Sequence, residues 1–183
     1  MKAIMIRDKP KWVAKILNGE KIIEIRKTYP KQLRGDTPFK PEPIDVYIYC
    51  TKSNYFGYIS KRYIGKVVAK FTLNKVEEIK TCERHSPELL KQSCLNANEF
   101  YDYLTKGKNF LGQILGYAWH ISNLVIFDKP KELSEFHRKG YEERLKREIK
   151  YSGDIAGIVS DTVSYWYQIK KAPQSWCYVE VEE

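Results

Sequence analysis

Three charged side chains, Lys21, Glu24 and Arg26, lie within one six-residue segment and are the residues best placed to do chemistry. A lysine that is partly removed from water can act as a general base or clamp a phosphate, and a glutamate nearby can carry a proton. An arginine held rigid by a carboxylate presents a planar fork that matches a phosphate or the edge of a base. The same residues also fit a structural ion pair between Glu24 and Arg26 beside an exposed lysine, so both interpretations stay open here.

The segment 21–27 is expected to be a strand that follows a short helix ending at Gly19, since glycine reaches a positive φ at little cost. In strict strand alternation, Glu24 and Arg26 share one face and Lys21 lies on the other. Lys21 and Glu24 therefore meet at one site only if a bulge interrupts the strand after Lys21.

Positive charge is concentrated near the N-terminus. The 183 residues carry 32 Lys and Arg against 23 Asp and Glu, a formal net charge of +9, and residues 1–34 hold ten of the basic residues but only three acidic ones. Such a field favours a polyanion, most simply a phosphate backbone, although a solubilising face has the same composition. Lys21, Glu24 and Arg26 are expected to line a cleft. The lysines expected to contact phosphates are Lys9, Lys11, Lys15, Lys27 and Lys31.

Tyrosine is abundant, with 14 copies, and combines an apolar ring suited to stacking on bases with a polar hydroxyl. Tyr47 and Tyr49 share one face of a predicted strand, where they suit base stacking or a tyrosine-rich rim. Trp12 is expected in the core or, failing that, as a stacking platform. The aromatic residues expected nearest the cleft are Tyr29, Tyr47, Tyr49 and Trp119.

No metal and no cofactor are expected. Cys82, His85 and Cys94 could supply ligands, but their spacing fits no common zinc pattern. The sequence contains neither a glycine-rich phosphate loop nor a nucleophile elbow.

The expected fold is α+β and mainly β, a single domain over residues 1–183 with an insertion at about 137–172. A small mixed or antiparallel barrel is predicted, with a helix capped by Asp8 between its first two strands and helical insertions at its periphery. Strands are predicted at 3–7, 21–27, 46–51, 65–79, 116–121, 124–127 and 176–181. Helices are predicted at 87–92 and 96–104, near Lys131, and over 141–150, where i, i+4 charge pairs are favourable.

The site of action is expected to be the cytoplasm. The apolar run at residues 3–6 is too short for a signal peptide, and no stretch approaches the roughly 20 apolar residues of a membrane span. Four widely spaced cysteines favour reduced thiols. No obligate protein partner is evident, and the oligomeric state is open.

A strand, a Lys9-Pro10 helix start and then Gly19-x-Lys21-x-x-Glu24-x-Arg26 together resemble the signature of the ASCH domain family, within the PUA-like superfamily. Pro30 and the strand that begins at Gly65 also resemble the family pattern. The runs 116–121 and 173–180 are similar to a phage- and prophage-associated subgroup. The resemblance covers both ends and the centre of the chain and omits the insertion.

This resemblance implies binding of RNA or a nucleotide in a cleft that the Gly-x-Lys motif lines. It also implies an alternative, an amidohydrolase that removes the acetyl group from acetylated cytidine with a lysine, a threonine and a glutamate. Lys21 matches that lysine, but Glu24 occupies the threonine position, and Glu88 and Glu99 are only candidates for the glutamate. A metal-dependent ribonuclease seeded by Glu24 and a phage protein that blocks a host partner are further alternatives.

Overall fold

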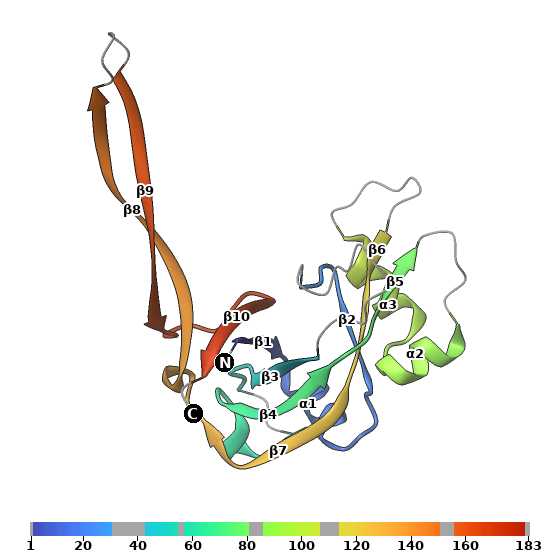
Figure 1. The fold of residues 1–183 in the computed structure, drawn as a ribbon. Coiled ribbons are helices and arrows are strands. Elements are labelled where there is room, and N and C mark those ends of the chain that lie inside the picture. Colours follow the sequence, from blue (N-terminus) through green and yellow to red (C-terminus); the bar gives the residue numbers. More distant parts are fainter. Residues whose placement is uncertain are drawn as a thin grey trace.

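The computed structural model describes residues 2–30, 43–54, 57–80, 86–106, 114–150 and 156–181. Its strands form two sheets (Figure 1). The larger has the order β7-β4-β3-β1-β10-β8-β9, made of Ser122–Lys131, Val67–Leu73, Ile44–Cys50, Lys2–Asp8, Trp176–Val181, Phe136–Lys150 and Ala156–Gln168. The smaller has the order β2-β6-β5, made of Ile23–Arg26, Ile114–His120 and Val76–Lys80.

The two sheets are joined by two stretches of chain that pass directly from one sheet into the other. After β4 only two residues precede β5, and after β6 a single residue precedes β7, so both stretches pass from one sheet into the other. The stretch 65–79 was predicted to be one long strand or two consecutive strands, and the structure has two, β4 and β5. The larger sheet is mixed, because β1 runs parallel to β3 and antiparallel to β10. A mainly β, α+β fold is confirmed, whereas the described strands do not close into a barrel.

The core surrounds β1, which is central in the larger sheet and covered on both faces. Ile4 and Ile6 point into one hydrophobic cluster, and Ala3 and Met5 point into another on the opposite face. This follows from the two-residue period of a strand whose four central residues, 3–6, are all apolar. The helix α1, Pro10–Leu17, packs its buried face against the first cluster. The end of β1 is thereby held rigidly beside the start of α1.

The ends of α1 differ in part from expectation. Its N-cap is Lys9 with no side-chain cap, and Asp8, predicted to cap it, is instead the last residue of β1. Pro10 opens the helix, where its missing N–H costs nothing. After the helix, Gly19 has a φ of +75°, as predicted for its stop.

Two further helices lie where the sequence predicted them. They are α2, Pro87–Ser93, and α3, Ala97–Thr105, and a short 3-10 turn η2 spans Lys61–Tyr63. Asn96 caps α3 in a capping box with Glu99. Among the described residues, no helix is both long and apolar enough to cross a membrane.

The helix predicted over 141–150 is wrong. This stretch belongs to β8, which pairs with β9 from His137 opposite Gln168 to Lys150 opposite Ala156. The two strands form an arm that extends away from the other strands of the larger sheet (Figure 1). β9 is rich in β-branched and aromatic residues, so pairing with it overrides the local helical preference of β8. The helix predicted near Lys131 is also wrong, because β7 runs to that residue and only the 3-10 turn η3, Leu133–Glu135, follows.

Candidate functional site

A cavity of about 630 Å³ opens where the end of β1, the start of α1, β2, α3 and the segment before β10 meet. This volume lies within the range of sites that hold small molecules or nucleotides. The lining contains five cationic side chains and two carboxylates, so the cavity as a whole favours an anion.

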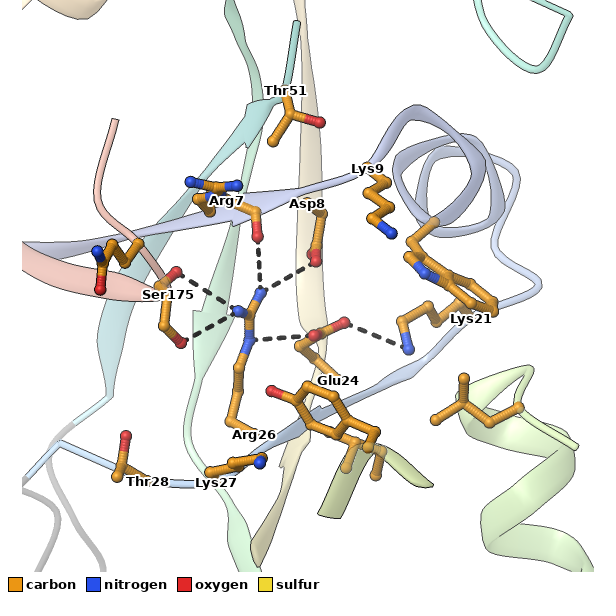
Figure 2. Close-up of a pocket in the computed structure, with 15 residues that line it drawn as sticks. Arg7, Asp8, Lys9, Lys21, Glu24, Arg26, Lys27, Thr28, Thr51 and Ser175 are labelled. Carbon is orange, nitrogen blue, oxygen red and sulfur yellow. Dashed lines mark hydrogen bonds and ion pairs between the residues drawn. The ribbon is translucent and has the colours of Figure 1, made fainter. Parts of the chain in front are cut away.

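The floor of the cavity is a chain of buried charges (Figure 2). Arg26 Nη2 lies 3.1 Å from Asp8 Oδ1, and Arg26 Nε lies 3.0 Å from Glu24 Oε1. Glu24 Oε2 in turn lies 3.2 Å from Lys21 Nζ. All four side chains are almost fully buried, and Glu24 contacts both cations, so removal of its charge leaves Lys21 and Arg26 without their shared counter-ion.

Lys21 and Glu24 meet without a bulge, because β2 begins only at Ile23 and Lys21 precedes the strand. The expectation that strand alternation separates them is therefore wrong. Lys21 Nζ also donates a hydrogen bond of 2.9 Å to the carbonyl of Ser93 in α2. Glu24 and Arg26 do share one face of β2, as predicted, while Ile23 and Ile25 pack on the other side.

Arg26 joins three distant parts of the chain. It donates to the carbonyl of Arg7 at 3.2 Å, and to the carbonyl and hydroxyl oxygens of Ser175 at 3.4 Å each. Together with Asp8, these contacts occupy both Nη atoms, while Nε lies in ion-pair range of Glu24 without a hydrogen bond. Arg26 therefore positions the floor, and its fork is not free for a ligand.

Asp8 has an oxygen that neither a hydrogen bond nor an ion pair engages, whereas Glu24 Oε2 and Arg26 Nε lack a hydrogen bond but are paired ionically. Its Oδ1 accepts from Arg26, but its buried Oδ2 has no hydrogen-bond partner among the described residues. Burial, and then the neighbouring carboxylate of Glu24, raise the pKa of Asp8 to about 7, although Arg26 and Lys21 act in the opposite direction. The lining of the cavity thus contains a buried carboxyl oxygen without a hydrogen-bond partner, on a group that exchanges its proton near neutral pH.

The rim supplies exposed cations and aromatic rings. Arg7 and Lys9 are exposed, and Lys9 extends toward the two carboxylates (Figure 2). Trp12 lines the wall beneath Lys21, whose Nζ lies 5.5 Å from the ring centroid. Tyr103 lines the cavity beside Lys27 Nζ, 5.6 Å from its ring, and burial raises the pKa of this phenol. The rim can therefore meet both a phosphate and a flat ring.

Five of the charged residues proposed from sequence line this cavity: Lys9, Lys21, Glu24, Arg26 and Lys27. Lys11 and Lys15 lie outside its lining. Lys11 pairs with Glu99 and Lys15 with Glu20, each at 3.3 Å. Lys31 lies outside the described residues.

The placement of aromatic residues at the cleft is wrong for four residues. Tyr47 and Tyr49 are buried, because β3 lies between β1 and β4 and both of its faces are covered. Trp119 is fully buried against Trp176 at a centroid distance of 5.9 Å. Tyr29 packs on Tyr117 at 4.4 Å and does not line the cavity.

Sequence reasoning missed Arg7, Asp8, Tyr103 and Ser175 as site residues. Asp8 was interpreted as a helix cap, and its position directly before Lys9-Pro10 was the only signal that linked it to the motif. Ser175 stands in the C-terminal run 173–180, which no local pattern connects to β2. Tyr103 is one of many tyrosines, and no spacing distinguishes it.

Within the part of the chain that the structure describes, no three His, Cys, Asp or Glu side chains are grouped as a metal site. Cys82 and His85 lie outside those residues. The metal-dependent ribonuclease therefore gains no supporting observation here.

Comparison with known proteins gave similarity in structure only. No family model matches the chain, and no curated protein matches it. Among solved structures, a point mutant of the ASCH protein from Zymomonas mobilis is similar over 73% of this chain and 77% of its own, at 15% identity and a TM-score of 0.47. The ASCH structure from the same organism covers 70% and 69% at 15% identity and 0.40. A second point mutant covers 70% of both chains at 16% identity and 0.39.

Proposed function

We propose that this chain is a nucleic-acid-binding module of the ASCH, PUA-like class, and that its cavity takes one nucleotide of single-stranded RNA. The N-terminal motif supports the class, and the cavity supports the ligand. The observation that carries the proposal is the unpartnered Oδ2 of Asp8 within a hollow of net positive lining. The phage-associated subgroup, closure into a barrel, a single domain with an insertion at 137–172 and action in the cytoplasm stay predictions.

Each part of the cavity has a role in this proposal. Asp8 Oδ2 accepts a hydrogen bond from an N–H of the base or a ribose hydroxyl, which satisfies a buried oxygen. Trp12 and Tyr103 offer faces for stacking. Arg7 and Lys9 meet the flanking phosphates, since both are exposed at the rim. The buried floor contributes no direct contact and holds Asp8 in place.

Lys9→Glu tests the proposal with little risk to the fold. Lys9 is exposed and makes no side-chain cap, and an acidic residue at the start of α1 favours the helix. Fluorescence anisotropy with single-stranded RNA should show binding that weakens steeply with salt. The variant should bind more weakly across all sequences, with a salt slope reduced by about one.

The matched control is Lys129→Glu, which makes the same charge change at an exposed position on β7, outside the cavity. It should bind like the wild type. Absence of binding by the wild type at low salt, or equal losses in both variants, contradicts the proposal.

A second candidate function is hydrolysis of an amide on a modified nucleoside such as acetylated cytidine. The near-neutral pKa of Asp8 favours it, because such a carboxyl can take a proton from water and return it to the departing amine. From the sequence, Lys21 was proposed to activate water or act as the nucleophile, with Glu24 as the proton carrier, but Lys21 Nζ is engaged by Glu24 and Ser93. A nucleoside panel followed by mass should show turnover that Asp8→Asn abolishes. Turnover that survives this change excludes Asp8 as the proton carrier.

A further inference from the structure

A second surface with a distinct composition lies at the base of the β8–β9 arm. Tyr165 and Tyr167, at the end of β9, are 44% and 40% exposed, and their ring centroids lie 5.8 Å apart. Together with Arg138, Lys170 and Lys171 they line a hollow of about 750 Å³. These five residues are called the arm-base platform below. Large exposed rings beside a hollow are typical of a binding surface.

The strand register places cation and ring on the same face. Arg138 of β8 is directly opposite Tyr167 of β9, and cross-strand partners project to one side of a sheet. Arg138 is exposed, as are Lys170 and Lys171 just after the strand. The platform therefore presents flat rings with positive charges around them.

Among the residues that the structure describes, no acidic side chain lines this hollow. Neither 137–139 nor 165–175 includes Asp or Glu, and the nearest acids along the chain are Glu135 and Glu142. This composition complements a polyanion that carries flat, unpaired rings. Single-stranded nucleic acid has both features, because phosphates meet the cations and bases stack on the tyrosines.

The platform adjoins the cavity. Gln174 lines both the cavity and the arm-base hollow. A third hollow adjoins both, since Arg7 lines it together with Lys170 and Lys171, and Glu132 lines it as well. A strand that leaves the cavity past Gln174 therefore comes out beside the platform.

We propose that single-stranded RNA with one nucleotide in the cavity continues across the arm-base platform, where its bases stack on Tyr165 and Tyr167. Arg138, Lys170 and Lys171 contact the phosphates of this second segment. This inference rests on the proposed function of the cavity. It gives the base of the arm a role in binding the part of the RNA that lies outside the cavity.

The test compares a mononucleotide with a single-stranded RNA of about twelve nucleotides, which exceeds what one pocket holds. Tyr165→Ala with Tyr167→Ala should weaken binding of the longer RNA at least about fivefold and leave mononucleotide affinity unchanged. Tyr165→Phe with Tyr167→Phe keeps both rings and should bind like the wild type. Tyr101→Ala, which removes a tyrosine of similar exposure from α3, is the matched control. Circular dichroism verifies that each variant is folded.

The outcomes separate the two proposals. If the wild type binds RNA and the alanine pair binds it equally well, the platform is not part of the RNA site and the inference is overturned. If the phenylalanine pair loses as much as the alanine pair, the hydroxyls and not stacking are responsible, which also overturns it. If the wild type binds no RNA, the proposed function itself fails. A duplex of the same length should show no dependence on the tyrosines, because its bases are already paired.

Discussion

Replacing Asp8 with asparagine is expected to change how the stability of the protein depends on pH. The pKa of Asp8 is raised from 3.8 to about 7 in the folded state, chiefly by burial and then by Glu24. The folded state therefore binds this proton more tightly than the unfolded chain does. Consequently, the contribution of Asp8 to the free energy of unfolding is complete below pH 3.8 and is lost as pH rises through about 7.

The magnitude follows from the size of the shift. Between pH 5 and pH 8 the wild type should lose roughly 2–3 kcal/mol through this group, at about 1.36 kcal/mol for each unit of pH below 7. Asparagine resembles the neutral acid in shape and does not titrate. Asp8→Asn should therefore gain stability relative to the wild type across this window and be the more stable protein at pH 8.

Urea denaturation at pH 5, 6, 7 and 8 measures the difference in free energy of unfolding between the wild type and Asp8→Asn. The titration of other groups largely cancels in this difference. Asp128→Asn, at an exposed position on β7, is the control and should follow the wild type throughout. A constant difference between wild type and Asp8→Asn over the window refutes the reasoning, as does a wild type that gains relative stability with rising pH.

Two further changes test the floor of the cavity and its support. Glu24→Gln leaves Lys21 and Arg26 buried without their shared counter-ion. The free energy of unfolding, measured by urea denaturation, should fall by about 3–5 kcal/mol. A loss below about 1 kcal/mol would show that Asp8 alone compensates both cations. Gly116→Ala would place a methyl group 2.5 Å from Leu104 Cδ2 and 2.8 Å from the carbonyl oxygen of Arg26. Thermal denaturation should therefore show that the free energy of unfolding falls by about 1–3 kcal/mol. An unchanged midpoint temperature would contradict this packing.

Local signals in the sequence predicted many of the helices and strands. The strand at 176–181 has the bounds that its alternating pattern indicated, and Asn96 caps α3 as its side-chain chemistry requires. The motif around Lys21 and Arg26 was also identified as the centre of the site, and the structure places both at one cavity. These features depend on short stretches of chain, where periodicity and capping decide the conformation.

Features that depend on distant partners could not be predicted. Tyr47 and Tyr49 were predicted to lie at an exposed rim, but both are buried. Strand alternation shows that they share a face of the strand, but it does not show which neighbouring element covers that face. The segment 141–150 looked helical because its charge pairs are local, whereas its partner strand β9 begins at Ala156. The role of Asp8 needed the register of β1 relative to β2, and these two strands belong to different sheets.

Arg26 bonds to Ser175, 149 residues further along the chain, and β10 lies beside β1 in the larger sheet. During synthesis β1 must therefore wait, with one edge unpaired, until residues 176–181 have left the ribosome. The cavity is thus completed only after residue 175 is made, and a nascent chain halted before Ser175 lacks a wall of it. Ligand binding by such a chain would report on the finishing step of folding, which is slow when contacts span so much sequence.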